Sequence, residues 1–92
     1  MDEKAVRAGL EALADNLDIE VRHENLDPDM SFSPGGLCLI KNRPVIIIDK
    51  AGSEKLKIKT LIQALRRFDL SRIYIKPALR ELLEAHNKEE TP

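Results

Sequence analysis

The side chains best suited to metal binding or nucleophilic chemistry are His23, Cys38 and His86, which are widely separated in the sequence. A zinc site needs three or four ligands at defined spacing, and the chain has no Cys-x-x-Cys pair. Cys38 stands among leucine and isoleucine, where a thiol is usually a small buried hydrophobe. A Cys38–His23 pair on adjacent strands is conceivable, because neighbouring strands lie about 4.8 Å apart. We nevertheless expect each histidine to make a local hydrogen bond, and we expect no catalytic residue, metal or cofactor.

Two loop motifs could bind ligands, but their spacing favours turns. Gly35-Gly36 lacks the spaced glycines and the Lys-Ser/Thr pair of a phosphate-binding loop, and no helix is expected directly after it. The glycines instead predict a turn or bulge with positive φ. Asp27-Pro28-Asp29 lacks the alternating ligands and the closing glutamate of an EF-hand, so it predicts a capped turn rather than a calcium site.

Charge is distributed unevenly along the 92 residues. Residues 1–34 hold three basic and nine acidic side chains, a net charge of −6. Residues 35–80 hold eleven basic and three acidic side chains, a net charge of +8, and residues 81–92 contribute −3. This asymmetry is the strongest charge feature of the sequence.

Basic side chains gather between residues 55 and 67. Lys55 and Lys59 are four residues apart and Arg66 follows seven residues after Lys59, so all three share one face of a helix; Arg67 is adjacent. A basic stripe can contact phosphate groups. It can also pair with acidic side chains of the same chain: Glu11, Asp15, Glu20, Glu24, Glu81 and Glu84. The formal net charge of −1 favours internal pairing, so nucleic acid ranks as a minor alternative partner.

These residues must be positioned by a β-hairpin and the elements around it. Leu37-Cys38-Leu39-Ile40 and Val45-Ile46-Ile47-Ile48 flank Lys41-Asn42-Arg43-Pro44, a pattern typical of two strands and a turn. Neither apolar run alternates with polar residues, so both faces of the hairpin need cover. The sequence leaves open whether the second run is a central strand or an edge offered to a partner.

Helical periodicity predicts what covers the hairpin. Apolar stripes indicate helices over residues 3–17, over residues 54–68 and from Pro77 onward, with Asp2 and Ser53 as N-caps. Gly9, inside the first helix, would permit close packing against another element.

The predicted fold class is α+β, in the order αβββα(β)α. Alternating apolar residues predict a strand over residues 18–26, and residues 73–75 form a short strand or an extended link. The expected sheet is small, mainly antiparallel, centred on the 37–48 hairpin and packed by three helices. Residues 1–87 are expected to form one domain, with a flexible tail at residues 88–92.

Composition narrows the class of protein further. The chain is 42% hydrophobic and 34% charged, which is typical of a globular domain. Its few aromatic residues predict an aliphatic core and argue against binding of single-stranded nucleic acid. A single cysteine excludes an internal disulfide. The charged N-terminus and apolar runs of four residues predict a cytoplasmic protein with neither signal peptide nor membrane span.

The order helix, strand, hairpin, helix resembles the start of a zincin-like metallopeptidase domain of the type that cleaves phage repressors. The matching stretches are Gly35–Ile48, residues 49–53 and the helix containing residues 61–67. The resemblance implies a metal-free, reduced relative with a binding role, because this helix has no His-Glu-x-x-His motif. The chain is also similar to short conserved bacterial proteins without an assigned activity.

We therefore expect a non-catalytic module for protein interaction or self-association, whose partner is another protein or a second copy of the chain. The residues expected to take part are Val45, Ile46, Ile47, Ile48, Lys55, Lys59, Arg66 and Arg67. One alternative is a small enzyme or ligand binder that uses a cleft near Gly35-Gly36, with His23 as base. The other is a weak nucleic-acid binder that uses the basic helix over residues 55–67.

Overall fold

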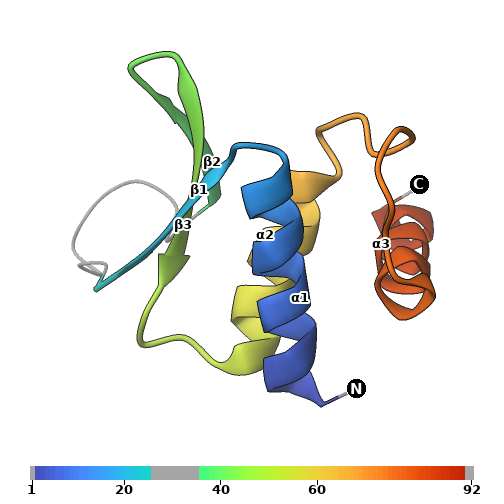
Figure 1. The fold of residues 1–92 in the computed structure, drawn as a ribbon. Helices are drawn as coiled ribbons and strands as arrows, with labels where there is room; N and C mark the ends of the chain where they lie inside the picture. The colour runs from blue at the N-terminus through green and yellow to red at the C-terminus, as the bar shows by residue number, and fades with distance from the viewer. Residues whose placement is uncertain (1, 26–35, 91–92) are drawn as a thin grey trace.

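The computed structural model describes residues 2–25 and 36–90, which contain three helices and a three-stranded sheet (Figure 1). In chain order the elements are α1 (Glu3–Asn16), β1 (Glu20–Glu24), β2 (Gly36–Ile40), β3 (Arg43–Asp49), α2 (Glu54–Leu65) and α3 (Pro77–Glu90). This confirms the α+β class and the predicted order of the elements.

Some boundaries differ from the prediction. Strand β1 begins only at Glu20, because Asp18 takes a left-handed turn with φ 60° after α1. Residues 73–75 form an extended link rather than a strand. Helix α3 continues through Glu90, so the predicted tail begins within helical residues. The predicted Asp27-Pro28-Asp29 turn lies outside the described residues.

The hairpin between β2 and β3 closes through Lys41 and Asn42. Their φ angles are 53° and 67°, and a type I′ turn requires positive φ at both central residues. Ile40 therefore faces Arg43 as the closing pair. Pro44 is the next residue of β3, where the backbone nitrogen points away from β2. Because the ladder to β1 begins at Val45, the missing N–H of Pro44 costs no sheet hydrogen bond.

The sheet has the order β1-β3-β2, so the Val45–Ile48 run lies in the central strand. Strand β2 is antiparallel to β3, whereas β1 is parallel to it, which makes the sheet mixed. The chain leaves β1, returns along β2 at the opposite edge and then inserts β3 between the two. This placement answers the question that the sequence left open.

Two helices cover one face of the sheet, and the third packs behind them. Helix α1 contacts β1, α2 contacts β2 and β3, and α3 contacts α1 and α2 but no strand. Figure 1 shows this succession from the sheet through the α1–α2 pair to α3. The residues buried most completely come from α1, β3 and α2: Leu10, Val45, Ile46, Ile48, Leu61 and Leu65.

The predicted helix starts have the expected caps. The Asp2 carboxylate accepts a hydrogen bond from the Ala5 N–H at 2.7 Å, and the Ser53 hydroxyl accepts one from the Leu56 N–H at 3.1 Å. Pro77 occupies the first position of α3.

Gly9 allows α1 and α3 to approach closely. A Cβ atom placed at Gly9 would lie 2.9 Å from Cδ1 of Leu79, a residue that is buried. The leucine side chain of α3 thus occupies the space that a side chain on α1 would need.

We expect Gly9→Val to lower the free energy of unfolding by about 2 kcal/mol, because it forces Leu79 out of its packed position. Gly9→Ala should change it by less than about 1 kcal/mol, since the gain in helix propensity offsets the shift of a flexible leucine end. Urea unfolding in the wild-type and Leu79→Ala backgrounds measures the coupling. An equal cost of Gly9→Val in both backgrounds would contradict the contact.

Candidate interaction site

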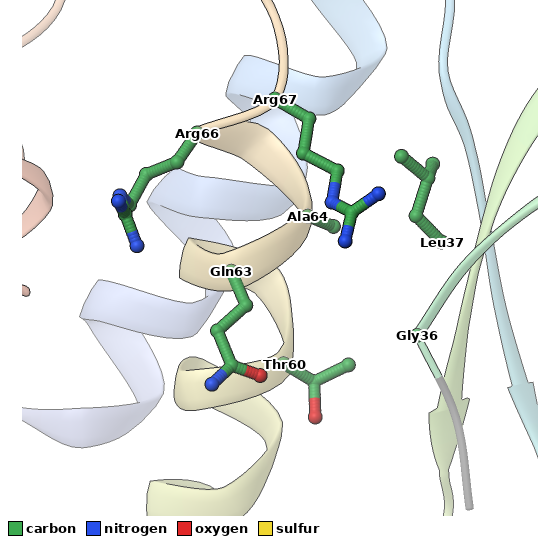
Figure 2. Close-up of a pocket in the computed structure, with 7 residues that line it drawn as sticks. All are labelled: Gly36, Leu37, Thr60, Gln63, Ala64, Arg66 and Arg67. Carbon is green, nitrogen blue, oxygen red and sulfur yellow. The ribbon is translucent and has the colours of Figure 1, made fainter. Parts of the chain in front are cut away.

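A groove of about 450 Å³ runs between β2 and α2 (Figure 2). One wall is the edge strand β2, and the other is a face of α2 together with the two residues that follow the helix. Its lining consists of Gly36, Leu37, Thr60, Gln63, Ala64, Arg66 and Arg67.

The helical wall owes its polarity to the spacing of three residues. Thr60, Gln63 and Arg67 recur at i, i+3 and i+7, so they share the flank of α2 next to the sheet. The Thr60 hydroxyl donates back to the carbonyl of Leu56 at 2.9 Å, which fixes its direction. The Arg67 N–H donates to the carbonyl of Ala64 at 3.2 Å, so this arginine lies in the turn that directly follows the helix.

The two neighbouring arginines point to opposite sides of α2. In Figure 2 the Arg67 side chain extends from the helix toward Leu37 of β2, whereas Arg66 extends away from the strand. Arg66 is half-buried and has an interaction of its own, and Arg67 is exposed. Arg67 is therefore the cation that the groove presents to the β2 edge.

The strand wall offers backbone groups on its outer side. In an antiparallel pair closed by Ile40 and Arg43, alternate residues of β2 turn their N–H and C=O groups toward β3. The backbone groups of Leu37 and Leu39 therefore point away from β3. No described strand lies beyond β2, and the Leu39 side chain is 71% exposed. The φ of Gly36 is positive, 121°, as predicted for this glycine, and Gly35 lies outside the described residues.

The basic residues of α2 are not neutralised in the way that internal pairing would require. Ion pairs in the described part of the chain include Arg7–Glu11, Arg7–Glu54, Arg22–Glu20 and His23–Glu11, and Arg66 has an interaction of its own. Lys55, Lys59 and Arg67 are exposed and take part in none of them. The expectation that the acidic residues pair with this stripe is therefore wrong for these three side chains. Of the expected acidic partners, Glu11 binds Arg7 and His23 instead, and Glu20 binds Arg22.

The apolar residues expected at the interaction surface lie elsewhere. Val45, Ile46 and Ile48 are at most 2% exposed and stand in the central strand, so their side chains are packed within the monomer. Ile47 is half-buried on the face of the sheet opposite α2. Of the expected residues, the structure brings only Arg66 and Arg67 to the groove.

His23 belongs to a polar network at the other edge of the sheet. Its Nε2 lies 2.9 Å from Oε1 of Glu11, and Oε2 of the same carboxylate accepts a hydrogen bond from Arg7 at 2.6 Å. Because an ionised carboxylate can only accept, Nε2 carries the hydrogen in this bond. Arg7 also donates to Glu54 at 2.6 Å, so the network joins β1, α1 and α2. The predicted local hydrogen bond of His23 is confirmed.

The nucleophilic pair considered from the sequence does not assemble. Strand β3 separates Cys38 on β2 from His23 on β1, and the register turns the two side chains to opposite faces of the sheet. Cys38 is half-buried rather than fully buried. His23 does not line the groove beside Gly36 either, so the expected cleft with a histidine base is not formed by these residues. The side chain of His86 lies outside the described residues.

Two further findings concern ligands and membranes. Among the described residues, no group of three or more histidine, cysteine, aspartate or glutamate side chains is arranged to hold a metal ion. None of the described helices is both long and apolar enough to cross a bilayer.

The role of the groove has to be inferred from its geometry, because comparison with known proteins gives no match. No protein-family model, curated protein or solved structure matches the chain. Leu37, Thr60 and Gln63 line the groove, but they are not among the residues predicted from the sequence to form a site. The polar spacing of Thr60, Gln63 and Arg67 was visible beforehand, but the strand that faces them depends on the sheet order.

The network around Glu11 predicts a pH-dependent contribution to stability. Partial burial pushes the pKa of Glu11 up, but hydrogen bonds from His23 and Arg7 together outweigh it, and the pKa lies below its ordinary value. A carboxyl group whose pKa is lower in the folded state stabilises the fold above its unfolded pKa of about 4.3. That stabilisation is lost as the pH falls through the folded pKa.

We expect Glu11→Gln to lower the free energy of unfolding by about 1 kcal/mol at pH 7, with the difference from wild type shrinking as the pH falls through the lowered pKa of Glu11. Glu81→Gln removes an exposed carboxylate that has no ion pair among the described residues, and it should have little effect at either pH. Urea titrations between pH 3 and pH 7 measure both. A deficit of Glu11→Gln that stays constant over this range would contradict the role of the charge.

Proposed function

We propose that the protein is a non-catalytic interaction module of the cytosol that binds an extended segment of another polypeptide as an added strand beside β2. The observation that carries this proposal is the outer side of β2, which faces a groove along α2 and no described strand. In strand addition, main-chain hydrogen bonds supply affinity, and pockets for alternate side chains supply specificity.

The dimensions of the edge support a short partner segment. Strand β2 has five residues, and the outward groups of Leu37 and Leu39 provide two N–H donors and two C=O acceptors. Alternate side chains of an added strand would enter the groove beside α2, and the others would extend the opposite face beside Cys38 and Ile40. A partner segment of about five residues would span the edge.

Self-association through the same edge is less favourable on electrostatic grounds. A two-fold pairing of β2 with itself would bring the basic groove of one copy toward that of the other, and like charges repel across such an interface. A second copy remains a distinct outcome of the test below, recognised by the mass of the complex.

The test uses three capped hexapeptides of alternating sequence: acetyl-(Thr-Glu)3-amide, acetyl-(Thr-Gln)3-amide and acetyl-(Thr-Lys)3-amide. At saturating peptide, hydrogen exchange of the Leu37 and Leu39 amides should slow by about tenfold or more, because a partner carbonyl then accepts each N–H. NMR exchange measures it residue by residue. Unchanged exchange of these amides with all three peptides would refute strand addition, and protection that grows with protein concentration alone would indicate self-association.

A pair of variants at one position separates backbone from side-chain recognition. Leu39→Pro removes an outward N–H without removing a bond to β3, and it should weaken binding of the best peptide by about fivefold or more. Leu39→Ala keeps the N–H and should retain most of the affinity. Circular dichroism and thermal unfolding of both variants establish that the hairpin is intact. Equal weakening by the two substitutions would favour a side-chain contact over strand addition.

A further inference from the structure

We infer that the segment bound beside β2 is acidic and that Arg67 holds one of its carboxylates within the groove. This inference rests on the strand addition proposed above and names the chemistry of the partner. It concerns a side-chain contact in the groove, whereas the proposal above concerns the backbone edge of β2.

The position of Arg67 is the first argument. Its side chain crosses from the end of α2 toward Leu37, and it lines the groove together with Gln63 and Thr60 (Figure 2). Within the described residues, neither Arg67 nor Gln63 forms a hydrogen bond or an ion pair through its side chain. The guanidinium of Arg67 and the amide of Gln63 therefore line the groove, and both can donate a hydrogen bond to an acceptor on a bound segment.

The charge around the groove is the second argument. Among the described residues, two arginines and no acidic residue line it, and residues 35–80, which include all of these lining residues, carry a net charge of +8. The planar guanidinium binds a carboxylate through two parallel hydrogen bonds. A carboxylate on a side chain of the added strand that enters the groove would therefore meet a complementary donor set, whereas a lysine there would face repulsion.

The geometry also favours a polypeptide over nucleic acid. The outward N–H and C=O groups of Leu37 and Leu39 alternate at strand spacing, and another polypeptide backbone matches that alternation. No aromatic residue of the described ranges 2–25 and 36–90 lines the groove, so these residues offer no ring for a base to stack on. Lys55 and Lys59 lie on α2 but do not line the groove, and they provide a control for general electrostatic attraction.

The experiment compares the same three hexapeptides by isothermal titration at 50 mM salt. We expect the Glu peptide to bind about fivefold or more tightly than the Gln peptide, and the Lys peptide to bind most weakly. In Arg67→Gln the preference for the Glu peptide should fall below about twofold. Lys59→Gln removes the same charge from α2 outside the groove, and it should preserve most of the preference. Raising the salt to 500 mM should reduce the preference in the wild type.

The outcomes separate the two proposals. If the Glu and Gln peptides bind equally and both protect the Leu37 and Leu39 amides, the acidic partner is refuted and strand addition stands. If Arg67→Gln and Lys59→Gln reduce the preference for the Glu peptide equally, that preference arises from the overall positive charge and not from a contact with Arg67. The inference is then refuted. Tighter binding of a single-stranded DNA 20-mer that displaces the Glu peptide would overturn it in favour of nucleic acid. Absence of binding by all three peptides refutes both proposals.

Discussion

The whole arrangement depends on one strand that has almost no polar side chain. Val45 to Ile48 present four consecutive β-branched residues, and three of them are at most 2% exposed. A strand of this kind is stabilised by neighbours along both edges and by cover over its faces. The fold provides the edges by placing β3 between β1 and β2, and it provides cover for one face through α1 and α2.

The protection of β3 leaves β2 as an edge. A three-stranded sheet has one interior strand, and here that strand is β3. The backbone groups on the outer sides of β1 and β2 therefore pair with no described strand. The edge of β1 is rich in charge, with Glu20, Arg22 and Glu24 exposed, which is a common defence against pairing. The edge of β2 has the uncharged residues Leu37 and Leu39 instead. The two edges therefore differ in chemistry, and the uncharged edge of β2 is the one to which we assign strand addition.

Local features of this fold could be predicted from the sequence, and non-local features could not. The hairpin, the caps Asp2 and Ser53 and the start at Pro77 follow from residues within a few positions of each other. The parallel pairing of β1 with β3 joins segments about 25 residues apart, as in the pairs from Glu20–Val45 to Glu24–Asp49. The pattern of apolar residues shows which face of a strand is buried, but it does not show which strand lies beside it. It therefore cannot specify such a pairing. The groove was missed for the same reason, since it exists only when β2 lies beside α2.

The distinction between local and non-local features also applies to the pairing of charges. The sequence suggested that the acidic and basic regions cancel by pairing, but pairing depends on which helix faces which strand. Helix α1 turns Arg7 and Glu11 toward Glu54 and His23, so a compact network joins α1, β1 and α2, and α2 contributes a carboxylate to it rather than a cation. Arg66 and Arg67 are adjacent in sequence, yet the end of the helix sends their side chains to opposite sides. A near-neutral chain can therefore keep a cation aimed at its open strand edge, because the neutralising charges lie on other surfaces.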